Sequence, residues 1–395
     1  MNARKFIHTI PIKLYLILLG LILFSFFSND FGLVDIQKTA VILAAAVDKS
    51  EEGFSVTTQI AVPKGSDRST GGTSSVEIQA EGATVSDCIT HIFSKTGWVP
   101  KLVFCNLILL GEEAAQEDVV SALNYFLRNE YMNDSCHLAV CEGKAHDIIS
   151  SKSAIDDTSS FAIGKLFSDA AEKSGRVLPI SLKKFAVDYY GVSKSSYMPL
   201  VRANSHGNQP QEQSSSSGSD ANLDDSGEDE KIYIADQTAI FSEGKMVAVL
   251  SPDQTLALSM LKGNIETGTF TAKDGEKLVT LSIRENDGKI SLDMKNAPKV
   301  TLALDVMVRL CCRGTTAPVE DISEDKVSPK VVENAKKYLT ELVTQIWEIA
   351  KESDCDLFDL KQKLYQTSAK KYEEWKDYLL STVTPDFQME VTSLQ

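Results

Sequence analysis

The chain has 395 residues, 43% of them hydrophobic, and carries a formal net charge of -15. Phosphate backbones and anionic lipid surfaces are bound by clustered Lys and Arg, so this acidic balance argues against nucleic acid as a partner. The length and apolar content are enough for roughly two or three domains with real cores. Seven cysteines leave at least one thiol unpaired in an exported chain, and we expect most of them to be core residues.

An unbroken apolar run from Leu14 to Ser28 follows three basic residues, Arg4, Lys5 and Lys13. A cleaved signal peptide has an apolar core of roughly 7–15 residues and a membrane helix needs roughly 17–25, so length alone leaves both interpretations open. Residues 26–29 offer no small-residue cleavage pattern, which favours an uncleaved anchor. The basic flank then holds the start of the chain on the cytoplasmic side and places the remainder on the outer face.

The next part of the chain alternates predicted strands and helices. Thr84 is a capping residue ahead of an apolar stripe that Gly97 ends, and a second amphipathic stripe covers residues 119–127. Strand patterns cover residues 39–47, 54–62, 102–110 and 136–141. This order predicts a mixed α/β domain.

Apolar residues nearly vanish between Asn204 and Glu230, which predicts an acidic disordered linker. Beyond it, Ser251-Pro252 begins a short helix that Gly263 ends, and Ser328-Pro329 begins a long amphipathic helix. Further strands are predicted around residues 278–283, 289–294, 300–310 and 387–391.

These patterns predict an α+β or mixed α/β fold in several domains, with three as the expected number, behind an N-terminal membrane helix. The expected boundaries are 1–33 for the anchor, 34–200 for an N-terminal domain, 201–231 for the linker, 232–270 for a small middle unit and 271–395 for a C-terminal domain.

The most suggestive metal cluster is Cys136, His137, Cys141 and His146. On a strand, His137 and Cys141 stand roughly 13 Å apart and Cys136 points to the opposite face, whereas zinc holds its ligands about 2.0–2.3 Å from one ion. Core packing is therefore the preferred interpretation of these residues, and no metal is expected.

Catalytic patterns are equally weak. Ser-x-x-Lys occurs several times, as chance would give, and no phosphate-cradling loop, His-Glu-x-x-His or Gly-x-Ser-x-Gly is present. Cys311-Cys312 closes an apolar strand, so burial is favoured over a redox pair. We assign no catalytic, cofactor-binding or metal-binding residue, and expect a protein that is not an enzyme.

Three segments read together resemble the N-terminal part of the Ger(x)C family, the C subunits of spore nutrient-germinant receptors. They are residues 107–114, 126–130 and 141–145. Weaker similarity lies in Val47-Asp48-Lys49, Glu81–Thr84, Thr238–Phe241 with Lys245 and Leu250, and Asp356-Leu-Phe358 before Leu364-Tyr365.

The resemblance implies a three-domain α/β fold and a subunit without enzymatic activity on the outer face of the inner spore membrane. Its implied partners are an integral-membrane A subunit and a transporter-like B subunit, and it assigns no small-molecule ligand to this subunit. Family members ordinarily carry a lipidated cysteine near the position of Asp30, but no cysteine precedes Cys88 here. The apolar helix is the expected substitute for that lipid.

Two other classes of function stay open from the residues alone. One is a generic membrane-anchored extracytoplasmic binding module, and the other is an anchored enzyme that modifies envelope polymers. The missing catalytic patterns disfavour the enzyme, whereas only the family resemblance separates the receptor subunit from the binding module.

Overall fold

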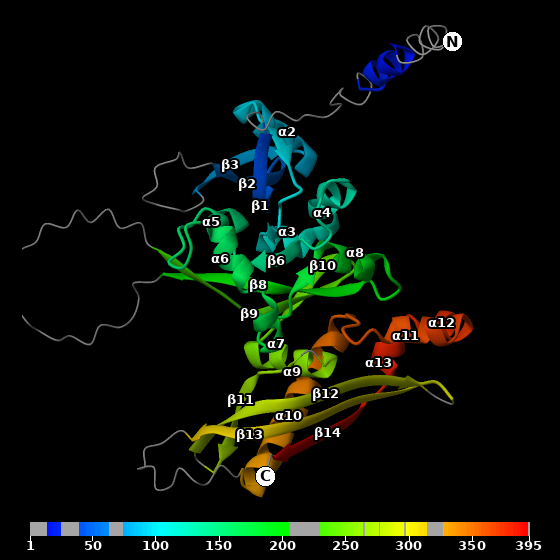
Figure 1. The fold of residues 1–395 in the computed structure, drawn as a ribbon. Coiled ribbons are helices and arrows are strands. Elements are labelled where there is room, and N and C mark those ends of the chain that lie inside the picture. Colours follow the sequence, from blue (N-terminus) through cyan, green and yellow to red (C-terminus); the bar gives the residue numbers. More distant parts are fainter. Residues whose placement is uncertain are drawn as a thin grey trace, which may run out of the picture.

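The computed structural model describes residues 14–24, 39–62, 74–205, 230–263, 265–275, 277–295, 298–313 and 327–393. Its fold is mixed α/β and multi-domain, with a ten-stranded and a four-stranded sheet, which confirms the predicted class. The four-stranded sheet lies at the opposite end of the molecule from strand β1 and helix α2 (Figure 1).

Part of the predicted anchor falls within the described residues. Residues 14–24 are helical, and most of their large apolar side chains are exposed. Among the described residues, no helix has both the length and the apolar content required to cross a membrane. Residues 1–13 and 25–38, which hold the rest of the predicted segment, lie outside the described part.

The ten-stranded sheet has four parallel strands at its centre, β1, β5, β6 and β8. Antiparallel pairing continues it on one side through β2 and β3 and on the other through β9 and β10, whereas the short β4 is parallel to β1. Along the main path the order is β10-β9-β8-β6-β5-β1-β2-β3, with β4 beside β1 and β7 beside β6. The strands are β1 Thr39–Ser50, β2 Gly53–Val62, β3 Ser74–Gly82, β4 Val99–Lys101, β5 Leu107–Leu110, β6 His137–Cys141, β7 Ile180–Ser181, β8 Ser195–Ser205, β9 Lys231–Ser242 and β10 Lys245–Leu250.

Helices cover both faces of this sheet, which explains why its central strands are apolar throughout. On β1, Ala45 and Val47 join the core under α2, α4 and α8, whereas Ala44 and Ala46 join the core under α5 and α6. The helices of this part are α2 Val85–Thr96, α3 Glu112–Glu117, α4 Val119–Arg128, α5 Ala145–Ile149, α6 Ser159–Lys165, α7 Asp169–Lys173 and α8 Leu182–Tyr190.

One predicted strand is wrong. The apolar run 102–110 forms only β5 at its carboxyl end, because residues 102–106 turn. The N–H of Cys105 donates to the carbonyl of Leu102 at 2.9 Å, and the N–H of Asn106 bonds back to Leu43 of β1 at 3.0 Å. A solid apolar pattern does not distinguish a buried strand from a buried turn, since both place apolar side chains in a core.

The second sheet has the order β11-β12-β13-β14, with β14 parallel to β13. The two separate strands predicted over 278–294 are one long strand, β12, because the polar residues between them remain in the ladder with β13. The elements are α9 Pro252–Lys262, β11 Thr269–Asp274, β12 Lys277–Asp293, β13 Lys299–Arg313, α10 Pro329–Glu352, α11 Leu360–Thr367, α12 Ala369–Trp375, α13 Leu379–Thr382 and β14 Asp386–Ser393.

The segment predicted as a linker joins neighbouring strands of one sheet. β8 and β9 pair antiparallel, with Ser205 opposite Lys231 at the open end of the pair, so residues 232–250 extend the first sheet. The predicted domain boundaries stay a prediction, since sheet membership alone does not delimit a folding unit. Residues 206–229 lie outside the described part.

Candidate functional site: a groove between two helices

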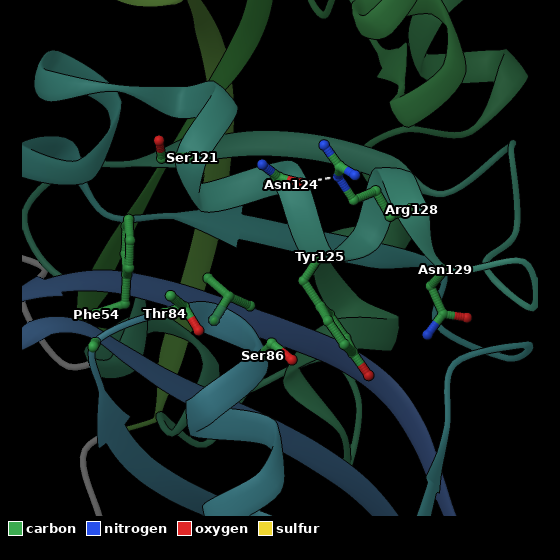
Figure 2. Close-up of a pocket in the computed structure, with 10 residues that line it drawn as sticks. Phe54, Thr84, Ser86, Ser121, Asn124, Tyr125, Arg128 and Asn129 are labelled. Carbon is green, nitrogen blue, oxygen red and sulfur yellow. Dashed lines mark hydrogen bonds between the residues drawn. The ribbon is translucent and has the colours of Figure 1, made fainter.

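A surface groove of about 600 Å³ lies between α2 and α4. Both helices cross the same face of the ten-stranded sheet, and their inward stripes belong to one core. The groove is therefore the outer seam between two helices whose inward faces are packed on the sheet (Figure 2). Its lining is Phe54, Ala83, Thr84, Val85, Ser86, Ser121, Asn124, Tyr125, Arg128 and Asn129.

Local sequence fixes the α2 side of the groove. Thr84 is extended and caps the helix, with its hydroxyl accepting from the N–H of Asp87 at 3.1 Å. At the far end, Gly97 adopts φ 69, the left-handed conformation that glycine tolerates best at a helix end. These two signals were the ones that predicted the helix, and the structure confirms them.

The α4 side supplies the larger side chains. Tyr125 reaches across the seam toward α2, while Arg128 folds back along its own helix (Figure 2). The Nε of Arg128 donates to the Oδ1 of Asn124, which positions the guanidinium at the rim. Burial raises the pKa of the Tyr125 phenol, so this group stays a neutral donor and acceptor at physiological pH.

The groove is lined by apolar and by hydrogen-bonding side chains. Its apolar floor is formed by Phe54, Val85 and the ring of Tyr125, and its rim carries hydroxyl, amide and guanidinium groups. Among the described residues that line it, none is a carboxylate, histidine or cysteine. The hydroxyl of Ser121 donates to the Oδ2 of Asp118 at 2.5 Å, and this aspartate caps the start of α4 through the N–H groups of Val120 and Ser121. The composition suits a peptide or another protein surface.

A second, smaller depression lies at the carboxyl ends of β1, β5 and β6, where open α/β sheets ordinarily receive ligands. Here Asp48 occupies the start of α5. The N–H of Ala145 donates to its Oδ1 at 2.7 Å, and the N–H of His146 donates to its Oδ2 at 2.8 Å. The protein's own carboxylate thus takes the position that an anionic ligand would occupy.

Three of the segments that carry the family resemblance meet at Asp48. The N–H of Gly111 donates to the carbonyl of Val47 at 2.9 Å, and the N–H of Glu112 to that of Gly143 at 2.8 Å. A Cβ on Gly111 would lie 2.1 Å from Asp48 Oδ1, so glycine is required for this close approach. These segments are therefore mainly structural.

Two other such segments border the groove instead. Ala83 and Thr84 end one of them, and Arg128 and Asn129 lie in the other, 126–130. The sequence pattern of the two segments does not predict that they meet, because only tertiary packing brings the start of α2 beside α4. Tyr125 carried no separate signal, since an aromatic residue on an amphipathic helix is usually a core residue.

The residues examined for metal binding do not converge. Cys136 and Cys141 belong to the cores on opposite faces of the sheet. His137 packs on Phe167 with ring centroids 5.5 Å apart, and the Nδ1 of His146 lies 2.9 Å from the Thr57 hydroxyl. In the described part of the chain, no group of three or more potential metal ligands is found.

The expected burial of Cys311 and Cys312 is wrong, because both are exposed. A β-bulge pairs Leu281 with Leu310 and Thr280 with Cys312, so Cys311 is the extra residue. The bulge breaks the alternation that would have continued the core side of β13. The other five cysteines are buried, as predicted for most of them.

Comparison with known proteins gives matches along most of the chain. Residues 33–203 match the spore germination protein N-terminal domain, and residues 236–393 match the family described as spore germination B3/GerAC like, C-terminal. Spore germination protein B3 of Bacillus subtilis (strain 168) is 24% identical over 277 residues, which are 67% of this chain and 66% of that protein.

The fold has a solved counterpart. The crystal structure of the GerBC protein superimposes with a TM-score of 0.53 and 17% sequence identity, and covers 89% of this chain and 97% of that chain. At this identity the likeness concerns the fold. The alignment with the curated relative spans slightly under two thirds of that protein's length.

Proposed function

Because this chain belongs to the Ger(x)C family of spore germination proteins, we propose that it is the C subunit of a nutrient-germinant receptor. The observation that carries the proposal is the order and extent of the two family matches, one over residues 33–203 and the other over residues 236–393. A single short motif can arise by chance, whereas two consecutive domain matches that together follow most of the chain do not.

In this proposal the subunit has no enzymatic role and supports assembly of the receptor. It is held on the outer face of the inner spore membrane by an anchor that includes the apolar helix 14–24, and it associates there with integral-membrane A and B subunits. The groove supports a binding role, since it combines an apolar floor with a hydrogen-bonding rim.

Isolation of the receptor from detergent-solubilised spore membranes tests the proposal. We expect affinity-tagged chain to carry with it a polytopic, transporter-like membrane protein, and we expect spores without this chain to lose their response to a nutrient while still germinating under a trigger that bypasses receptors. A chain that purifies alone from spores with unchanged nutrient responses would overturn it.

The groove has a separate test within the same preparation. Tyr125→Ala removes the ring that spans the seam and should reduce the amount of co-purified membrane subunit several-fold. Tyr190→Ala, at a tyrosine that is 72% exposed and lies outside the groove lining, is the matched control and should leave recovery unchanged. Equal recovery with both variants would show that the groove does not contact the membrane subunit. The proposal that the chain is a receptor subunit would still stand.

A further inference from the structure

Four large apolar side chains stand exposed at one end of the ten-stranded sheet. They are Val99 (44% exposed), Val103 (50%), Phe104 (57%) and Tyr131 (60%), and we call them the amino-end patch. All four lie where the parallel strands β1, β5 and β6 begin. Val99 is paired with Thr39, the first residue of β1, and the other three belong to the connections that enter β5 and β6.

The backbone presents these side chains outward in a fixed way. In the turn before β5, Leu102 and Cys105 are buried, and the hydrogen bond between them holds Val103 and Phe104 at the tip. The core therefore takes two of the turn's four apolar residues and leaves two in solvent. Exposed apolar side chains that gather in one place indicate a surface with a partner.

The surroundings of the patch combine aromatic rings with a flexible cation. The Nζ of Lys101 lies 5.4 Å from the centroid of the Tyr131 ring, and the half-buried Trp98 adjoins Val99 in the chain. Aromatic residues and snorkelling lysines are the side chains that favour the boundary between lipid and water.

Charge near the patch is close to balanced. Lys101 and the exposed Glu130, which precedes Tyr131 in the chain, carry opposite charges, and Asp134 is paired with Lys183 at 3.0 Å. Attraction to anionic headgroups therefore contributes little, and the net charge of -15 works against it. Any affinity of this surface for a membrane must come from its apolar groups.

The position of the patch along the chain identifies its partner. Residues 25–38 are all that separates the apolar helix 14–24 from Thr39, and fourteen residues span at most about 50 Å. The patch thus occupies the end of the molecule that is tied to the apolar segment, whereas the four-stranded sheet lies at the opposite end (Figure 1).

We propose that the amino-end patch rests on the lipid bilayer, with Phe104 and Val103 inserted among the headgroups and the four-stranded sheet held away from the membrane. This inference rests on the proposed membrane attachment and adds the orientation of the protein on the membrane. It also leaves the groove and the distal sheet free for other subunits.

Tryptophan quenching by brominated lipid tests the contact. The full chain carrying Phe104→Trp is reconstituted into phosphatidylcholine vesicles whose acyl chains bear bromine, which quenches only rings that approach the bilayer. The control is Leu278→Trp in β12, a position of similar exposure (55%) in the four-stranded sheet. Quenching is measured relative to the unsubstituted chain, which contains three native tryptophans.

We expect at least a two-fold loss of the added emission for Phe104→Trp, unchanged by high salt, and no loss for Leu278→Trp. Val103→Trp is a second probe at the same tip, should the first variant alter folding by circular dichroism. Attached chain with no extra quenching at either tip position would overturn the orientation alone. Quenching that is seen only after co-reconstitution of membrane subunits would overturn the inference that the apolar groups of the patch hold this orientation by themselves. A chain that leaves the vesicles would overturn both the orientation and the attachment.

Discussion

Two buried aspartates each hold the start of a helix, one in each half of the molecule. Asp48 binds the first N–H groups of α5, and Asp356 accepts from Leu360 at 2.9 Å and from Lys361 at 2.7 Å at the start of α11. Burial raises the pKa of both carboxyls, although the backbone hydrogen bonds act in the opposite direction. Both aspartates lie in segments of the family resemblance, and the structure gives those segments a folding role.

Asp356 predicts a specific dependence of stability on pH. Because the folded state holds its proton more tightly than the unfolded chain, the stability that this group contributes is largest at acidic pH and falls as pH rises from the ordinary value of 3.8 toward the raised one. We expect the free energy of unfolding of the wild type, minus that of Asp356→Asn, to be larger at about pH 4 than at about pH 7.

Denaturant unfolding at the two pH values measures this difference. Asp386 provides a control of opposite sign, because hydrogen bonds to Gln388 and Lys299 lower the pKa of its carboxyl. The stability that Asp386 contributes should therefore increase with pH. If the free energy of unfolding of the wild type minus that of Asp356→Asn increased with pH, the raised pKa of Asp356 would be contradicted.

Gly288 of β12 packs so closely on α9 that no Cβ atom can be added without moving the backbone. A Cβ there would lie 2.3 Å from the carbonyl oxygen of Met260 and 2.4 Å from that of Leu261, both at the end of α9. We expect Gly288→Ala to force these backbones apart and lower the free energy of unfolding by about 1–3 kcal/mol. Gly164→Ala in α6 is the control, since its Cβ would meet nothing within 4 Å. It should be neutral or slightly stabilising in the same melts.

At the scale of elements, the sequence predicts best those helices whose ends are set by local capping residues. α2, α9 and α10 were recognised from their caps, and Ser251 forms the full capping box with Gln254. Prediction failed where tertiary contacts decide: the turn at 102–106, the continuity of β12 and the bulge at Cys311. α9 combines both situations. Its caps predict where the helix begins and ends, but it is buried on all sides, so no amphipathic stripe predicts which face contacts the core.

The connection between β8 and β9 gives a prediction at the same scale. Ser205 and Lys231 are opposite each other in the ladder, so a hairpin-length connection is enough to join the strands. Deleting Gln209 to Asp229 leaves four residues between them, including Gly207 and Asn208, which suit a tight turn. We expect the melting temperature to change by no more than a few degrees. A fall of many degrees would show that the removed segment contributes to the core.

At the scale of the molecule, the ten-stranded sheet and the part of the chain that packs on the four-stranded sheet share buried contacts. The hydroxyl of Thr255 on α9 donates to that of Thr238 on β9 at 3.1 Å, and Ile240 of β9 belongs to the same core as the four-stranded sheet. The loop before α11 adds a second link, since the N–H of Asp356 donates to Ser195 of β8 at 2.8 Å. These contacts join segments far apart in sequence, so neither they nor the groove could be predicted from local pattern.

The arrangement proposed for the whole receptor depends on membrane attachment, and the prediction for this attachment concerns helix 14–24. Leu18 and Leu21 are 56% and 61% exposed, as expected of side chains whose solvent is lipid and not a protein core. Replacing both with Arg costs about 3 kcal/mol each on translocon scales and should abolish insertion, while Leu18→Ile with Leu21→Ile should retain it.

Membrane fractions washed with high salt measure the outcome, because ionic strength screens charge but leaves apolar burial intact. We expect the wild type and the isoleucine pair to remain in the membrane until detergent is added, and the arginine pair to be lost from it. Intact-mass analysis of the retained chain should show residues 14–28 still present. A mature N-terminus between Asn29 and Leu33 would mean cleavage, in which case the ectodomain is held only by its partner subunits and by the amino-end patch.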